Sequence, residues 1–263
     1  MKDCSITVLA LWTTLSVAVF APSAQSAEIR MLSAGAVELG LAPVLDQFQR
    51  QSGHTVRVSF AAAPAIGPQI AADPGFDVVI APPAVLDALA GRGTLGTERV
   101  VIGRVGIGIA VRANAATPDI ANAETLTQEL LSADAVVYNR ASTGLYIEKL
   151  VRRLGIADRV DARAVRVGDG AAVMQRLLAG TAPRELGFGA ITEIVLFRDR
   201  GIRLVGPLPA ALQNFTTYTA APVRHATRAE APRPDAAVSA LLQYLERPPA
   251  RSTFAEAGID APR

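Results

Sequence analysis

The stretch RVVIGRVGIGIAV, residues 99–111, is rich in β-branched residues and longer than the other strand-type segments of the chain. Such a composition favours an extended strand, and strands are usually only about five or six residues long. We expect this strand to run from one lobe of the protein into another. A second extended segment is expected at Gln213–Ala221, where Thr and Tyr residues gather, and it returns the chain to the first lobe.

Before this stretch, short apolar strands alternate with helices. Strands are expected at Glu28–Leu32, Thr55–Phe60 and Asp77–Ile80, and a helix at Pro83–Ala90. Another helix is indicated by the spacing of Leu41, Val44, Leu45 and Phe48, which fall on one face. Alternation of this kind indicates a parallel sheet with helices on its faces.

A second α/β series follows the long strand. Strands are expected at Ala135–Tyr138, Val160–Val167, Glu185–Phe188 and Ile202–Val205, and helices after Ser142 or Thr143 as cap, at Ala171–Leu178, Ala236–Leu245 and Ser252–Ala257. The predicted fold class is therefore α/β with two lobes, each a mostly parallel sheet flanked by helices. We expect lobe 1 to contain residues 28–103 and 216–263, and lobe 2 residues 108–208, with a cleft between them.

Residues 1–27 have the pattern of a secretory signal peptide. Lys2 precedes an apolar run, Ile6–Phe20, and small residues follow at 21–27. The run is short for a membrane span, although a retained anchor is the alternative. Cys4 lies before the run, which argues against a lipoprotein. We therefore expect a periplasmic protein.

The composition excludes several classes of function. Of 263 residues, 26 are basic and 24 acidic, and no Lys/Arg run occurs, so nucleic acid is not an expected partner. Cleavage of the signal would remove the single Cys, and the two His lie in no recognisable motif. We expect no metal, no cofactor and a monomer.

Ligands in two-lobed α/β folds bind where strand carboxyl ends meet helix amino ends. This geometry selects Ser33–Val37, Phe60–Ile66, Asn139–Gly144, Gly168–Ala171 and Gly187–Thr192. Their free backbone N–H groups suit an anionic ligand. The candidate ligand-binding residues are Ser33, Ala34, Gly35, Ala63, Arg104, Asn139, Arg140, Ser142, Thr143, Gly189 and Tyr218.

Each charged or aromatic candidate has a structural alternative. Arg140 is either a cation facing the cleft or a surface residue, and Arg104 either a cleft cation or part of a salt bridge. Asp169 suits a helix N-cap, and Glu193 a first-turn helix acid or a base facing a ligand. Tyr218 is either a packing residue or a ligand contact.

The chain resembles periplasmic solute-binding proteins of the molybdate-binding type. The residues that carry the resemblance are Met31-Leu32-Ser33-Ala34-Gly35-Ala36, Phe76-Asp77-Val78-Val79-Ile80, Val137-Tyr138-Asn139-Arg140, Glu185-Leu186-Gly187-Phe188-Gly189-Ala190 and Gly206-Pro207-Leu208-Pro209. The resemblance implies the two-lobed type II fold of such proteins. It also implies capture of a small anion between the lobes and delivery to the membrane permease of an ABC-type importer.

The chain departs from that family's molybdate site, which the resemblance implies is made of hydroxyls and backbone amides. Ser33 keeps the first hydroxyl, but Ala61-Ala62-Ala63 replaces a loop that usually carries serine, and Ala190 stands where a tyrosine is common. Arg140 adds a guanidinium, which is a bidentate match to a carboxylate. These departures favour an organic acid over molybdate, while both stay open.

The same resemblance also includes aconitate isomerase, an enzyme with this type of scaffold that shifts a proton along an allylic tricarboxylate. Such an enzyme needs cations to hold the carboxylates and a base to move the proton. Arg140 and Arg104 are the candidate cations, and Glu193, Asp169 or Tyr138 the candidate base. Transport without chemistry is the first reading, and the isomerase is the alternative.

Overall fold

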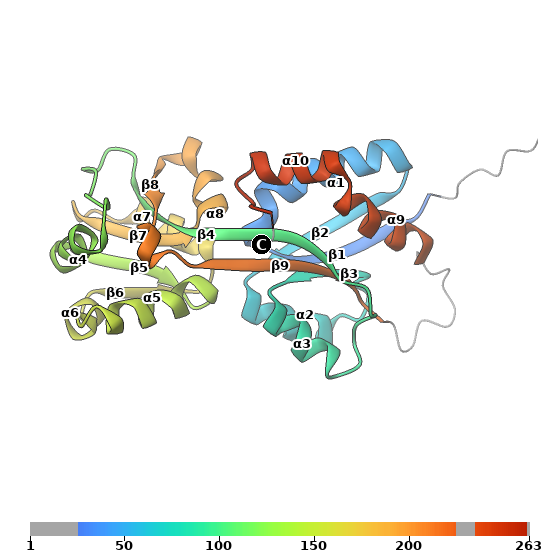
Figure 1. Cartoon of the computed structure of the whole chain (residues 1–263), viewed down its shortest axis with the longest axis horizontal. Coiled ribbons are helices and arrows are strands. Elements are labelled where there is room, and N and C mark those ends of the chain that lie inside the picture. Colours follow the sequence, from blue (N-terminus) through green and yellow to red (C-terminus); the bar gives the residue numbers. More distant parts are fainter. Residues whose placement is uncertain (1–25, 225–234, 262–263) are drawn as a thin grey trace, which may run out of the picture.

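One strand, β4 (Val100–Arg112), belongs to both lobes of the molecule. The computed structural model describes residues 26–224 and 235–261. The first part of β4, Val100–Gly106, pairs antiparallel with β9 (Phe215–Pro222), and Ile107–Ala110 pairs antiparallel with β7 (Glu185–Ala190). Figure 1 shows β4 and β9 running side by side across the middle of the molecule. Both predicted crossings are confirmed.

Lobe 1 is built on a parallel pair of strands that a third strand extends. Its elements are β1 (Glu28–Ala34), η1 (Gly35–Val37), α1 (Glu38–Ser52), β2 (Thr55–Ala61), α2 (Ala63–Ala72), β3 (Val78–Ala81), α3 (Pro83–Ala90), α9 (Asp235–Glu246) and α10 (Pro248–Glu256). The strand order β2-β1-β3-β9-β4 places β1 between two parallel neighbours. Leu32, Ile80, Leu241 and Phe254 are buried in one core, so the C-terminal helices complete the lobe.

Lobe 2 has helices on both faces of its sheet. Its elements are α4 (Ala123–Ser132), β5 (Ala135–Asn139), α5 (Ser142–Arg153), α6 (Ala157–Asp161), β6 (Ala164–Val167), α7 (Gly170–Ala179), β7, α8 (Ile191–Val195), η2 (Arg198–Arg200), β8 (Ile202–Pro207) and η3 (Ala210–Leu212). Successive residues of β5 point to opposite faces. Val136 and Tyr138 therefore join one core with Leu150, while Val137 joins another with Met174.

The predicted fold class is confirmed. β5 pairs parallel with β6 and β7, as β1 does with β2 and β3, and every antiparallel pair of the described strands includes β4 or β9. The lobe boundaries, 28–103 with 216–263 and 108–208, stay a prediction. Most of the expected signal peptide, and the whole of its apolar run, lies outside the described residues.

Two predicted elements begin several residues away in the structure, and helices α2 and α4 are additional to the predicted ones. The strand expected at Val160–Val167 begins at Ala164, because α6 continues to Asp161 and buries Val160 completely. The last helix begins at Pro248 rather than Ser252, since proline is tolerated in a first helical turn. Helices α2 and α4 were not predicted, although Asn122 and Thr125 form a capping box at the start of α4.

The C-terminal segment is fastened to the crossing strand. Arg104 and Asp260 exchange two backbone hydrogen bonds, each 2.9 Å long. Gly103 makes this approach possible, because a Cβ there would lie 2.5 Å from the backbone oxygen of Asp260. Figure 1 accordingly shows the C-terminus beside β4 in the middle of the molecule.

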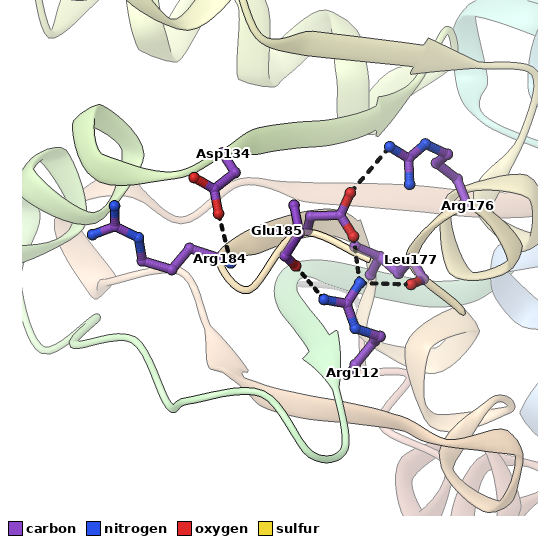
Figure 2. Close-up of polar contacts among 7 residues, drawn as sticks. Arg112, Asp134, Arg176, Leu177, Arg184 and Glu185 are labelled. Atoms are coloured by element: carbon purple, nitrogen blue, oxygen red, sulfur yellow. Dashed lines mark hydrogen bonds and ion pairs between the residues drawn. The ribbon is translucent and has the colours of Figure 1, made fainter. Parts of the chain in front are cut away.

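At the far end of lobe 2, a buried carboxylate joins three elements. Glu185, at the start of β7, forms ion pairs with Arg112 at the end of β4 and with Arg176 of α7, the latter 3.0 Å long. Arg112 also donates to the backbone oxygens of Leu177 and Ala182. Figure 2 shows Glu185 between the two guanidinium groups. Removing a buried carboxylate from water is costly unless cations and donors surround it, as they do here.

Candidate functional site

Two adjoining cavities lie where the strand ends of both lobes meet. The first, called here the apolar cavity, spans about 470 Å³ of space that is partly open to solvent, and it is lined by Gly35, Glu38, Phe60, Ala61, Ala62, Asp169, Ala171, Glu193, Leu196 and Phe197. The second, the polar cavity, encloses about 340 Å³ and is lined by Ala34, Gly35, Ala36, Ala61, Ala62, Ala63, Asn139, Ala141, Ser142, Thr143, Gly170, Ala190, Glu193 and Tyr218. They share Gly35, Ala61, Ala62 and Glu193, so together they form one cleft site.

The turn after β1 forms the lobe 1 wall of both cavities. The backbone of Gly35 approaches Glu193 so closely that a Cβ at Gly35 would lie 3.2 Å from the Glu193 Oε1 atom. Ala36 accepts a hydrogen bond from the buried hydroxyl of Thr192 on α8, with an oxygen–oxygen distance of 2.5 Å. This bond joins the two lobes at the edge of the cleft.

The Asn139 loop of lobe 2 forms the polar cavity's opposite wall. Asn139 Oδ1 accepts hydrogen bonds from the backbone N–H groups of Ala141 and Gly144, both 3.1 Å long. The side-chain amino group of asparagine is a donor of two further hydrogen bonds. Gly144 lets α5 start directly against the strand, because a Cβ there would overlap the Asn139 carbonyl oxygen.

The predicted capping role of Ser142 and Thr143 is wrong. Ala141 occupies the N-cap position of α5, and no side chain caps the helix there. Asn139 instead accepts from the N–H groups of Ala141 and Gly144, while Ser142 and Thr143 line the polar cavity. The first turn of α5 therefore offers hydroxyls together with unpaired helical N–H groups, a combination suited to anions.

Glu193 is the carboxyl group that both cavities share. It lies in the first turn of α8, and the backbone amide of Ala190 hydrogen-bonds to it, which confirms the first-turn acid expected from the sequence. Burial is the main cause that raises the pKa of Glu193 from its ordinary value of 4.5 to about 7; the Ala190 amide opposes the rise, and the nearby carboxylates of Asp169 and Glu38 contribute to it. A carboxyl group with such a pKa exchanges protons at neutral pH.

Other acidic groups surround Glu193. Asp169 lines the apolar cavity and caps α7, accepting from the Ala172 N–H at 2.7 Å, so the expected N-cap is confirmed. Burial raises the pKa of Glu38, and the Arg200 guanidinium opposes this. Arg200 also lies 4.9 Å from the ring centre of Phe197. Arg200 is thus an exposed cation beside two lining residues, Glu38 and Phe197, and the sequence analysis did not single it out.

The structure brings most of the predicted ligand-binding residues together. Ala34, Gly35, Ala63, Asn139, Ser142, Thr143 and Tyr218 line the polar cavity. Tyr218 is buried, and burial raises the pKa of its hydroxyl, as does the neighbouring Glu193. Phe60, in the selected loop Phe60–Ile66, was not named as a candidate, and Glu38, Leu196 and Phe197 were missed altogether; all four line the apolar cavity. Phe60 ends an expected strand, which was a usable cue for that residue alone.

Other predicted residues lie outside both linings. Ser33 is fully buried, and its hydroxyl donates to the Ala34 oxygen at 3.2 Å. Gly189 lies in β7, where its missing side chain faces Met174 and Ile194. Arg140 is exposed on the loop.

The remaining two candidates are Arg104, in the crossing strand β4, and Tyr138, in a core of lobe 2. Arg104 stacks 4.2 Å from the ring centre of Phe215 and lies 3.8 Å from Asp260, as its salt-bridge alternative predicted. Tyr138 is fully buried in a lobe 2 core, and its hydroxyl has no hydrogen-bond partner among the described residues. Neither residue belongs to the lining of the two cavities.

Within residues 26–224 and 235–261, no three or more His, Cys, Asp or Glu side chains are grouped to hold a metal ion. No helix in the same ranges is long and apolar enough to cross a membrane.

Two α/β lobes, joined by crossing strands and enclosing a cleft lined by helix amino ends, define a protein of the two-lobed ligand-binding class. The chain belongs to the family of bacterial extracellular solute-binding proteins, whose model matches residues 29–260. Family members are periplasmic solute-binding proteins, and the predicted resemblance to the molybdate-binding type is confirmed.

Individual relatives differ in what they bind or catalyse. The chain is 30% identical over 242 residues to an aconitate isomerase of a Pseudomonas species, covering 88% of this chain and 87% of that protein. It is similar to the periplasmic molybdate-binding protein of Azotobacter vinelandii, with a TM-score of 0.72, 18% identity, and coverage of 89% and 100%. It is also similar to a tungstate ABC transporter structure from Geobacter sulfurreducens, with a TM-score of 0.65, 15% identity, and coverage of 87% and 98%.

Proposed function

We propose that this protein captures a small organic carboxylate in the cleft site and delivers it to the permease of an ABC importer. One observation carries the proposal: a cavity lined by hydrogen-bond donors adjoins a cavity whose lining combines apolar side chains with the acidic residues Glu38, Asp169 and Glu193. Asn139, Ser142 and Thr143 suit the carboxylate end of a ligand. Phe60, Leu196 and Phe197 suit its carbon skeleton.

An inorganic oxyanion suits this cleft less well. Ser33 donates its hydroxyl to the neighbouring Ala34 oxygen, and the second loop presents only Ala61, Ala62 and Ala63. Tetrahedral oxyanions also have no carbon to place against Phe60 and Phe197. The relative named as an aconitate isomerase supports the same choice, because aconitate is a tricarboxylate.

The isomerase is the second candidate, and Glu193 is the observation that favours it. In an allylic shift, a base takes a proton from one carbon, the double bond moves, and a proton is returned to the carbon at the other end. A single carboxyl group can do both when its pKa lies near the working pH. Glu193, whose pKa is about 7, meets this condition in the cleft. Asp169 is occupied as the N-cap of α7, and Tyr138 lies in the core.

The location and partners follow from the same proposal. The signal-type segment, residues 1–27, would direct the protein to the periplasm. There the protein would act as a monomer. A permease then receives the ligand as the two lobes separate. An isomerase would need no permease, so loss of import on deletion of the gene separates the two candidates.

A thermal-shift panel on the mature chain tests the proposal. The panel contains molybdate, tungstate, sulfate, phosphate, dicarboxylates and tricarboxylates. A ligand that binds the native state alone at 100 times its Kd adds about 2.7 kcal/mol of stability. We expect carboxylates to stabilise the protein and oxyanions to leave it unchanged; the reverse result would remove the proposal. Incubation with cis-aconitate, followed by NMR, tests for the trans isomer.

A further inference from the structure

The carboxyl group of Glu193 lies where the two lobes meet, close to the backbone of two glycines. A Cβ at Gly35 of lobe 1 would lie 3.2 Å from its Oε1 atom, and one at Gly170 of lobe 2 would overlap its Oε2 atom. The absence of a Cβ at Gly35 and at Gly170 therefore leaves the space that the Glu193 carboxyl group occupies. Because Glu193 also lines both cavities, a ligand that fills the cleft comes to lie beside this group.

The groups that face Glu193 supply no positive charge. Asp169 approaches from the start of α7, Glu38 from α1, and the Tyr218 hydroxyl from β9, while the Ala190 amide donates from its own element. Arg200 lies near Glu38 rather than near Glu193. Among the described residues that line the two cavities, none is Lys or Arg.

We propose that an anion binds in the cleft together with one proton, which Glu193 takes up and shares with the ligand as an O–H donor. An ionised carboxylate at this place would repel an incoming anion, whereas a protonated carboxyl group donates a hydrogen bond to it. The inference rests on the proposed capture of a carboxylate and adds its regulation. No bond other than the transferred O–H changes, and the proton comes from water.

The resting state of Glu193 makes the uptake measurable. With a pKa of about 7, the group is largely ionised in the free protein at pH 7.5. The complex should then take up roughly 0.7 proton at pH 7.5 and much less at pH 6. Affinity for a fully ionised ligand should fall as the pH rises above 7, by up to tenfold per pH unit.

Calorimetry in buffers of different ionisation enthalpy tests the inference on the mature chain. The probe is propane-1,2,3-tricarboxylate, which has no double bond and cannot undergo an allylic shift. The slope of the observed enthalpy against the buffer's ionisation enthalpy gives the number of protons taken up. We expect a slope of roughly 0.7 at pH 7.5 for the wild type.

Two variants make the result specific. Glu193→Gln keeps an acceptor for the Ala190 amide and a donor for the ligand, so it should bind with no proton uptake and no dependence on pH between 6 and 8. Glu124→Gln removes an exposed first-turn acid of α4 and should behave as the wild type does. A slope near zero in the wild type, or an equal slope in Glu193→Gln, overturns the inference while leaving carboxylate capture intact. If no carboxylate of the panel binds at either pH, the proposed function fails as well.

Discussion

Glu185 and Glu193 lie near opposite ends of the same strand, yet their surroundings differ completely. Glu185, at the start of β7, is 3% exposed and has ion pairs to Arg112 and Arg176. Glu193 follows the end of β7 and has one backbone amide and two further carboxylates as neighbours. The carboxylate of Glu185 is therefore neutralised by its ion pairs, whereas the carboxyl group of Glu193 is able to bind a proton.

The surroundings of Glu185 are those of a group that stabilises the fold, and the surroundings of Glu193 are those of a group that can take part in a reaction or in binding. Breaking a buried ion pair leaves an uncompensated charge, so Glu185 is tied to the stability of lobe 2. A strongly shifted pKa in a cleft marks a candidate functional group, and Glu193, in the first turn of α8, meets that description. The three predictions below compare the two sites.

Replacing the paired glutamate should have the largest effect. Glu185→Gln keeps the side-chain volume but leaves Arg112, whose side chain is 16% exposed, without its carboxylate. We expect a loss of about 3–5 kcal/mol in the free energy of unfolding, measured by urea denaturation. Arg176→Gln should cost less, because its side chain is 34% exposed and Arg112 remains. A loss below about 1 kcal/mol for Glu185→Gln would show that the pair contributes little.

Replacing the unpaired glutamate should change how stability depends on pH. The pKa of Glu193 is about 7 in the folded chain and near 4.5 when unfolded, so the folded chain holds a proton that the unfolded chain has released between these values. The resulting stability is complete below about pH 4.5 and is lost as the pH rises through 7. The loss of stability amounts to at most about 3–4 kcal/mol, at about 1.36 kcal/mol for each unit of the pKa difference.

Subtraction isolates this contribution from those of other carboxyl groups. We expect the stability of the wild type minus that of Glu193→Gln to fall between pH 4.5 and 7.5, in urea titrations at a series of pH values. A flat difference would mean that Glu193 is ionised over the whole range. A difference that rises with pH would mean that an unseen cation pairs with it.

Much of the fold could be predicted because its signals are local. The apolar strands and the long crossing at β4 are continuous in sequence, so both were found. Helix α2 was missed because Pro64, Gly67 and Pro68 hide its pattern. The start of α4 does have a local signal, the capping box of Asn122 and Thr125, although this helix was not predicted.

The site was predictable as a set of loops but not as a set of side chains. Strand ends and helix starts locate the Gly35 and Asn139 turns. Whether a side chain enters the cleft depends on the backbone direction at its position, so Ser33 turns into its own strand and Arg140 toward solvent. The environment of Glu193 depends on glycines about 20 and 160 residues away in sequence, which no local pattern reveals.

The smallest expected effect concerns the neighbour of the unpaired glutamate. Asp169→Asn removes one negative charge near Glu193 and keeps the side-chain oxygen that accepts from Ala172, and asparagine is as good an N-cap as aspartate. Because Asp169 is exposed, water screens its field, and we expect the pKa of Glu193 to fall by only about half a pH unit. The measurement is the midpoint of the pH-dependent stability difference between Asp169→Asn and the double variant that also carries Glu193→Gln. An unchanged midpoint would mean that burial alone sets the pKa of Glu193, whereas a higher midpoint would contradict the repulsion between the two carboxylates.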